Sequence, residues 1–555
     1  DGLDGWKNHY QLLLNLCEMH AEVSRSIGDY KTCERYIQLV LENARCLKDK
    51  HRVFVAQIDA LGSQDKLHLA LDTGFRTLRQ LGHYLPRHVG KFQVIGAIMR
   101  ASKCVKEKSD GEILGIQELE DENDLLAMKI MTGLILFAWL ATQKNVTVLL
   151  SLHMFQISVK RGLSQYSAYA FAVFGYVQGV MIKFDEAHRW GQLAINLSDR
   201  YQDKGCDCRT FVIVDSFLAH IRRPLHERME HSLRGYEFGM EAGDVQFSCL
   251  AAAVYIMMYY HGGLPLDPLL KDASAFSQLA LKYKQDVTST TILCHYQVAL
   301  NLTGRNENPV RIAGEAIDMR EVAGGEGNVR NQRHSYLMLE NQLAYLFEDM
   351  EVADARLQAL WKDPDVVDGS NFWVSSLLMY FSLTAIEMIK KGGSLKHRRQ
   401  ARKYSKLLEI WVKQGVLNCQ QKLLLVQAEQ ASIKERDPRR VREMFEQAIV
   451  LATKTGFKQD AALANERAGK YMLEKGSADD KWVARGFLSE AHLLYGEWGA
   501  KAKVEQMESK YDFLNEEDHS QTSSPFRGRS RFTDRPLSKH EKFNALKYAT
   551  SFGDQ

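Results

Sequence analysis

The segment 226–231 (HERMEH) is the part of the sequence most similar to a catalytic metal box. The HExxH box of zinc peptidases places its two histidines four residues apart, so that both imidazoles lie on one face of a helix. Here His226 and His231 are five residues apart. We therefore expect no metal site at this segment.

Acidic residues at 118, 120, 121 and 122 are the densest group of carboxylates that could act as a general acid and base. Catalytic carboxylates need burial to separate their pKa values, whereas like charges this close together are normally exposed. We expect it to be an exposed loop or helix start. The sequence also lacks a G-x-x-x-x-G-K-[ST] phosphate loop, a G-x-S-x-G elbow and an H-R-D motif. These observations predict no catalytic site, no cofactor and no metal.

Charge gives little support for nucleic-acid binding. The formal net charge is only +3 over 555 residues, whereas a phosphate-binding surface needs concentrated basic residues. The basic run at 396–406 is followed by apolar residues at helical spacing, which favours a solvated helix face over a nucleic-acid patch. Residues 521–555 carry seven Lys or Arg and three Asp or Glu without apolar periodicity. We predict a mostly disordered basic tail at 515–555, with a short helix near 539–548.

The elements that would position any site are helices. Apolar residues recur three to four positions apart along most of the chain, for instance over 10–27 and 32–47. The uncharged stretches 130–143 and 248–260 are shorter than the roughly 20 residues that a bilayer needs, and we expect them to form buried central helices. Most of the nine cysteines lie in apolar helical patterns, including those at 17, 46, 249 and 294, which favours reduced structural thiols.

A repeat near the end of the ordered chain defines the expected fold. The pattern at 444, 448, 452 and 456 returns 43 residues later at 487, 491, 495 and 499, and the turn residue Asp437 is matched by Asp480. Helix pairs at this period are typical of tetratricopeptide-like arrays. We predict an all-α superhelical array of antiparallel helix pairs. The predicted domains are N-terminal repeats at 1–90, a central repeat region at 91–430, C-terminal repeats at 431–514 and the tail.

The segments 462–468 (ALANERA) and 495–504 (YGEWGAKAKV) carry a family resemblance. Together they resemble the end of the helical region of large multidomain signalling ATPases, which join a kinase-like domain, a P-loop ATPase, a GAF sensor and a histidine kinase. Weaker resemblance extends over about 8–514. The catalytic domains of that family are absent from this sequence. The resemblance implies structural or interdomain roles for Ala462, Asn465, Glu466, Arg467, Trp498, Gly499, Lys501 and Lys503.

The predicted function is a non-catalytic, cytoplasmic scaffold in a signal-transduction system. Its partners would be a neighbouring ATPase or output domain or separate signalling proteins, without nucleic acid or membrane insertion; the oligomeric state stays open. Two alternatives also stay open. One is a small-molecule sensor region, with the aromatic residues at 255, 259, 260, 372, 373, 380 and 381 around a pocket, although aromatic side chains at helical spacing are more often core. The other is an enzyme whose site is formed by residues distant in sequence.

The last repeat makes a local prediction. Apolar spacing over 495–504 predicts one final helix that buries Trp498. Gly499 would allow a neighbouring backbone to approach, and Lys501 and Lys503 would point outward. Such a helix would cap the array or transmit movement to the tail.

Overall fold

The computed structural model describes residues 2–324, 330–363, 367, 370–476 and 480–515. Regular secondary structure in these ranges is helical, with no strand and only two isolated β-bridges, Glu118 to Leu163 and Ala313 to Asp318. The all-α prediction is confirmed. The predicted tail after residue 515, with its short helix, lies outside the described residues.

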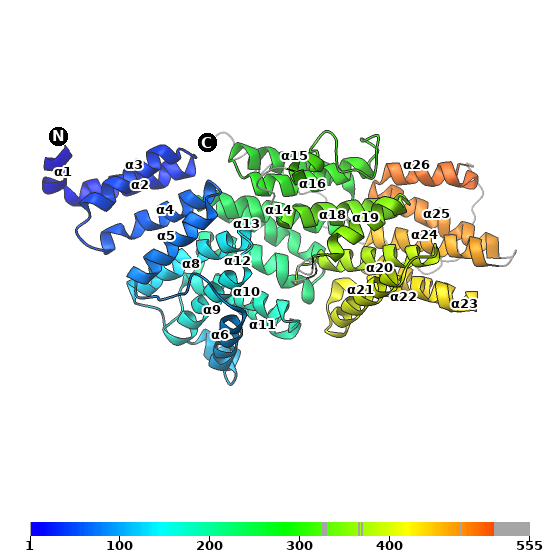
Figure 1. The fold of residues 1–555 in the computed structure, drawn as a ribbon, viewed down its shortest axis with the longest axis horizontal. Helices are drawn as coiled ribbons and strands as arrows, with labels where there is room; N and C mark the ends of the chain where they lie inside the picture. The colour runs from blue at the N-terminus through cyan, green and yellow to red at the C-terminus, as the bar shows by residue number, and fades with distance from the viewer. Residues whose placement is uncertain (1, 325–329, 364–366, 368–369, 477–479, 516–555) are drawn as a thin grey trace. The chain divides into compact units, whose positions relative to one another are not determined.

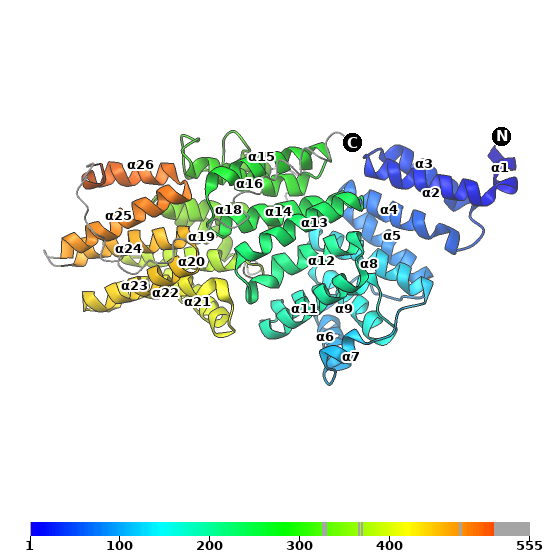
Figure 2. The ribbon, with the colours of Figure 1, turned by 180° about the vertical axis from the view of Figure 1, so that it is seen from behind.

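The chain forms two compact units. Unit 1 comprises residues 1–214, 234–251 and 281–285, and unit 2 comprises 215–233, 252–280 and 286–555. The domain boundaries predicted at 90, 430 and 514 stay predictions. Figures 1 and 2 show the helices from opposite sides.

Unit 1 contains eleven complete helices in its described part: α1 (Gly2–Asn8), α2 (Tyr10–Ser26), α3 (Tyr30–Asn43), α4 (His51–Ser63), α5 (Leu67–Gln80), α6 (Lys91–Val105), α7 (Asp110–Leu114), α8 (Glu122–Leu140), α9 (Lys144–Lys160), α10 (Gln165–Val180) and α11 (Phe184–Tyr201). Residues of α12 (Lys204–Phe217), α13 (Met229–Glu241), α14 (Val245–His261) and α15 (Leu266–Lys282) are divided between the two units.

Unit 2 continues with α16 (Asp286–Leu302), α17 (Met319–Gly324), α18 (Arg330–Leu346), α19 (Met350–Trp361), α20 (Val374–Lys390), α21 (Leu395–Lys413), α22 (Gln420–Lys434), α23 (Pro438–Lys454), α24 (Lys458–Lys475), α25 (Asp480–Trp498) and α26 (Lys501–Lys510). Most sequential helices of this series pack as neighbours, including α18 with α19, α20 with α21 and α24 with α25.

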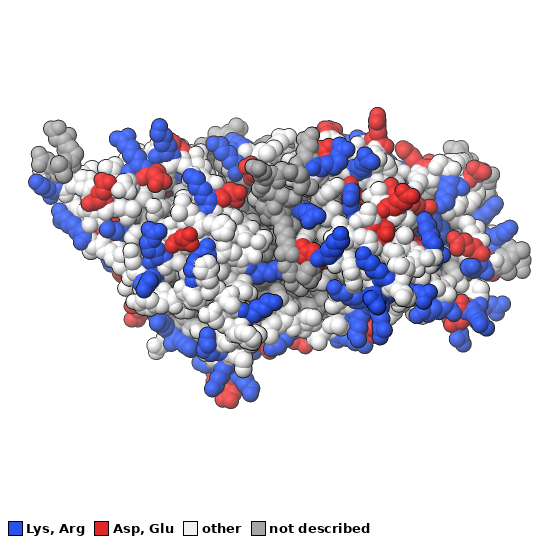
Figure 3. Space-filling model, viewed as in Figure 1, with Lys and Arg blue, Asp and Glu red and all other residues white. Residues whose placement is uncertain are grey.

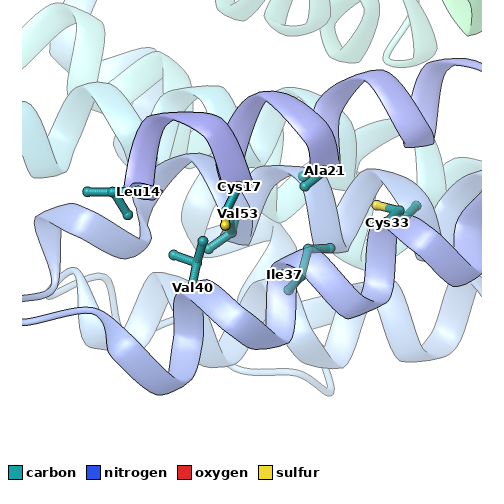
Figure 4. Close-up of a cluster of buried hydrophobic side chains, with 9 residues drawn as sticks. Leu14, Cys17, Ala21, Cys33, Ile37, Val40 and Val53 are labelled. Carbon is teal, nitrogen blue, oxygen red and sulfur yellow. The ribbon is translucent and has the colours of Figure 1, made fainter. Parts of the chain in front are cut away.

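The first helix pair shows why these segments fold as they do. Leu14, Cys17 and Ala21 lie on one face of α2 and pack with Ile37 and Val40 of α3, as Figure 4 shows. The turn between the helices uses Gly28 at a φ of +77°, and the Asp29 side chain accepts a hydrogen bond from the amide of Thr32. Apolar spacing forms the face, and the glycine and the cap end one helix and begin the next.

Helix α8 is the buried central helix that the stretch 130–143 predicts. It is long and apolar enough to span a bilayer by composition, and it is the one such helix among the described residues. However, 72% of its most apolar window is buried within the fold, which is typical of a core helix. The second stretch, 248–260, lies in α14, and almost all of its side chains are buried as well.

The 43-residue repeat corresponds to helices α23 and α25. The Asp437 side chain caps α23, and the matching Asp480 is the first residue of α25. Both helices are followed by a glycine in the left-handed region, Gly456 at a φ of +80° and Gly499 at +93°. Helix α24 packs against both of them, and Figures 1 and 2 show the three helices side by side in both views.

Two local predictions are wrong. The segment 495–504 is not one helix, because Gly499 takes a left-handed φ that ends α25 at Trp498, and α26 begins at Lys501. Cys46 is not in a helical core pattern either. It is exposed and follows the end of α3, whereas Cys17, Cys249 and Cys294 are buried free thiols.

Candidate functional site

The resemblance residues of the ALANERA segment lie on α24, in the middle of the C-terminal helices of unit 2. Because α24 packs between α23 and α25, it is buried over most of its circumference. Ala462 and Asn465 are buried, and the Asn465 amide donates to the carbonyl of Ala461 at 2.9 Å. Glu466 is also buried, and only 13% of the Arg467 side chain is exposed, so both side chains need partners inside the fold.

Lys503 of α26 is the main partner of Glu466. Its Nζ donates to Glu466 Oε1 at 2.8 Å, to the carbonyl of Leu346 at 2.5 Å and to Gln506 Oε1 at 2.8 Å. The prediction that Lys503 points outward is wrong, because only 1% of it is exposed. Burial lowers the pKa of Lys503 to about 8, although the neighbouring Glu466 partly offsets this effect.

Glu466 accepts from three side chains. Besides Lys503, they are Lys470 of the same helix, at 2.5 Å, and the Tyr495 hydroxyl of α25, at 2.8 Å. Burial alone would raise the pKa of Glu466, but the two lysines outweigh it and hold the pKa well below the usual range. The carboxylate is therefore charged at neutral pH and joins α24, α25 and α26.

Arg467 extends the same arrangement in the other direction. Its Nε donates to Glu429 Oε1 of α22 at 2.5 Å, and its Nη2 donates to Glu387 of α20. Lys390 of α20 also donates to Glu429, at 2.6 Å. Burial opposes ionisation of Glu429, but Arg467 and Lys390 outweigh it and lower the pKa to about 2.

Glu348, in the turn between α18 and α19, completes the arrangement. It accepts from Lys470 and, at 2.7 Å, from Lys510 of α26. Despite partial burial, the two lysines lower the pKa of Glu348 to about 2. We call the whole set the charge cluster: Glu348, Glu387, Lys390, Glu429, Glu466, Arg467, Lys470, Lys503 and Lys510.

The ion pairs of the charge cluster connect neighbouring helices to one another. A lysine with a pKa near 8 can act as a base or nucleophile when substrate reaches it. The Lys503 ammonium, however, has all three of its donors engaged by protein acceptors and is buried. Each carboxylate of the cluster is likewise matched by one or more cations. The arrangement therefore holds α20, α22, α24 and α26 together.

The remaining resemblance residues surround the break between α25 and α26. Trp498 is 1% exposed, as its predicted burial requires, and its ring centroid lies 6.3 Å from that of Tyr260. A Cβ at Gly499 would lie 3.4 Å from Leu266 Cβ and 3.5 Å from its amide nitrogen. The predicted close approach at Gly499 is thus present. Lys501 is exposed, as predicted.

The other candidate residues form separate local contacts. His231 Nδ1 lies 2.8 Å from Asp215 Oδ2, and Arg228 Nε donates to the same carboxylate at 2.9 Å. Within the residues that the structure describes, no group of three His, Cys, Asp or Glu side chains could hold a metal ion. In the acidic run, Glu118 accepts from the Tyr201 hydroxyl at 2.6 Å, and Asp121 caps α8.

The two tyrosines Tyr255 and Tyr260 of the aromatic set lie in the core, and the basic run lies on the surface of a helix. Tyr255 and Tyr260 are buried, and the Tyr255 hydroxyl donates to Asp272 at 2.7 Å. The Lys and Arg residues of 396–406 are exposed on α21. In Figure 3, basic side chains gather over α21, while both signs of charge are interspersed on the rest of the face in view.

Sequence reasoning missed the partners of ALANERA. Glu348, Glu387 and Glu429 lie 38 to 122 residues from their partners on α24, and no local spacing marks them. The one local signal is the pair of Glu466 and Lys470 four residues apart, which commonly face each other on a helix.

Comparison with known proteins gives a weak link to signal transduction. No protein-family model matches the chain. The hybrid signal transduction histidine kinase G of Dictyostelium discoideum is 20% identical over 332 residues, which cover 55% of this chain and 9% of that protein. The chain therefore spans only a small part of the length of the curated relative that it matches.

Proposed function

We propose that this chain is a non-catalytic helical-repeat scaffold that connects domains of a signal-transduction protein. The charge cluster is the observation that carries the proposal. It recruits the most characteristic resemblance residues, Glu466, Arg467 and Lys503, and it uses their charges to fix one helix against the next. In this proposal, the charged side chains of the cluster stabilise the packing of the helices and do not take part in catalysis.

Two further observations support the same function. Helices α23 and α25 share their 43-residue spacing, an aspartate at their start and a left-handed glycine after their end, as expected for stacked units of a tetratricopeptide-like array. The similarity to a hybrid histidine kinase supports a signalling context. A stiff array in such a protein would set the distance between a nucleotide-binding module and an output module.

The experiment combines an activity assay with a binding assay. Purified chain is tested for ATP hydrolysis and autophosphorylation, and we expect no turnover. Binding is then measured by calorimetry against purified ATPase and kinase domains encoded by the same gene, with at least one saturable complex expected. Turnover by the chain together with no binding to any of these domains would overturn the proposal.

A matched pair of variants makes the test specific to rigidity. Lys503→Met disrupts the charge cluster, and Lys501→Met changes an exposed lysine on the same helix. We expect only Lys503→Met to weaken communication between the flanking modules, measured as stimulated kinase activity of the full gene product. Equal activity of the two variants would contradict the role of the cluster.

A further inference from the structure

A polar cavity of about 70 Å³ lies within unit 1. Three turns between consecutive helices border it, and they contribute Gly28 before α3, Asp244 before α14 and Lys284 after α15. By the volume that one water molecule requires, the cavity has room for roughly five waters. A group the size of phosphate or carboxylate would fit the same space.

Basic side chains outnumber acidic ones around the cavity. The basic residues that line it are Arg25, Arg209, Lys282 and Lys284, and the acidic ones are Asp59 and Asp244. The formal net charge of the lining is therefore +2, from four cations and two carboxylates. The charge cluster differs, because each of its cations forms an ion pair with a carboxylate.

Two of the basic lining residues, Arg209 and Arg25, form ion pairs with the two acidic ones. Arg209 Nε donates to Asp244 Oδ2 at 2.6 Å, and its guanidinium carbon lies 4.6 Å from the Phe247 ring centroid. Arg25 Nη1 lies 4.0 Å from Asp59 Oδ2. Burial disfavours the charge of Arg209, but Asp244 outweighs burial and raises the pKa of Arg209 above its usual range. Arg209 is thus held in its charged form by Asp244.

Lys284 supplies a cation that no protein carboxylate neutralises. Within the described part of the chain it forms no ion pair, and its Nζ would lie 3.8 Å from a Cβ built on Gly28. The ammonium therefore sits beside the turn that begins α3. The first residues of α3 and α14, Tyr30 and Val245, also line the cavity. Each of these two helix N-termini is already capped by a carboxylate, Asp29 for α3 and Asp244 for α14.

We propose that this cavity binds the phosphate group of a small phosphorylated metabolite. Phosphate matches the excess of positive charge in the lining, the Lys284 ammonium, which is unpaired within the described residues, and the size of the cavity. The aromatic rings of Tyr30, Phe247 and Tyr283 line the same space and offer apolar surface to the organic part. Since the cavity lies in unit 1 and the charge cluster in unit 2, the proposal does not depend on the scaffold function.

Calorimetric titration of the full chain tests the proposal at constant ionic strength. The probes are glucose 6-phosphate, AMP and inorganic phosphate, with glucose, adenosine and sulfate as controls. We expect saturable binding of one or both phosphorylated compounds, and weaker binding of inorganic phosphate. Tighter binding of inorganic phosphate would overturn the metabolite as the ligand, and equal binding of sulfate would indicate an adventitious ion only.

Three single variants locate the bound phosphate. Lys284→Gln should weaken binding about tenfold or more, the scale of one hydrogen bond to a charged group, and Lys284→Arg should preserve it. Lys129→Gln removes the same charge from an exposed residue of α8 outside the cavity and should have no effect. Lys284 is itself exposed, so the fold should tolerate its variants, as thermal melts would verify. Unchanged affinity in Lys284→Gln, or no saturable binding of any phosphate compound, would overturn the proposal.

Discussion

The Lys503 ammonium lies 2.8 Å from the Glu466 carboxylate, and both side chains are almost completely buried. Glu466 is shared by Lys503 and Lys470, with a tyrosine hydroxyl as its third donor. Glu466 thus compensates the buried Lys503 and shares Lys470 with Glu348, which makes it the most sensitive position of the charge cluster.

Glu466→Gln should therefore destabilise the C-terminal helices strongly. It keeps the shape of the side chain but removes the carboxylate paired with the buried Lys503 and one of the two carboxylates paired with Lys470, at a cost of about 3–5 kcal/mol. Urea denaturation followed by circular dichroism measures this change. The double variant Glu466→Gln with Lys503→Met removes the stranded cation and should recover part of the loss. A double variant that equals the sum of its two single variants would contradict the pairing.

The cluster also predicts a loss of stability in acid. Glu429 has a pKa of about 2 in the fold against an ordinary value of 4.5, so the folded state binds its proton more weakly than the unfolded state does. Its contribution, of the order of 3 kcal/mol, is fully present above pH 4.5 and is lost as the pH falls towards 2.

The variant Glu429→Gln tests this acid dependence. It should flatten the decline of unfolding free energy between pH 4.5 and pH 2, as measured by denaturant titrations across that range. Glu474→Gln is the control, because Glu474 is exposed on α24 and should leave the profile unchanged. Identical slopes in the two variants would show that Glu429 does not carry the effect.

Trp498→Ala should destabilise the fold by about 3–5 kcal/mol, the usual cost of removing a buried large aromatic ring. Trp482 provides a control on the same helix, since it is 62% exposed. Trp482→Ala should change stability by no more than about 0.5 kcal/mol. Thermal melts of the two variants separate the cases, and equal melting temperatures would place the Trp498 ring at the surface.

Gly499→Ala and Gly486→Ala should act in opposite directions. Gly499 has a φ of +93°, so alanine there adds backbone strain and should destabilise by at least about 1 kcal/mol. Gly486 lies inside α25, and a Cβ there would meet no neighbouring atom within 4 Å. Alanine at 486 should stabilise by about 0.5–1 kcal/mol. Denaturant midpoints measure both changes, and a shared sign would contradict the break at Gly499.

Local sequence pattern predicts the helices well but the position of charges poorly. The apolar period of 10–27 and the 43-residue repeat both correspond to real helices, because helix formation depends on residues three to four apart. The same reasoning fails for Lys503, which it predicts to be exposed and which is buried. Its burial is decided by Glu466, 37 residues earlier, and by the carbonyl of Leu346, 157 residues earlier.

The cavity in unit 1 illustrates the same limit. Arg25 lies in the last turn of α2, Arg209 in the interior of α12 and Lys284 in the turn after α15. Nothing in the local sequence marks the three as neighbours, and only folding brings them to one cavity. The resemblance residues were accessible from sequence because they lie in two short segments, but their partners were not.

The order of synthesis gives the position of Lys503 and Lys510 a further consequence. Both residues emerge from the ribosome after every carboxylate of the charge cluster, so Glu348 and Glu466 remain only partly compensated until α26 has been translated. Helices α18 to α25 can form one by one as the chain lengthens. The ion pairs of Glu348 and Glu466 with Lys510 and Lys503, however, cannot form until α26 has been synthesised. A nascent chain stalled before residue 501 should consequently be sensitive to protease, and release of α26 should convert it to a resistant form.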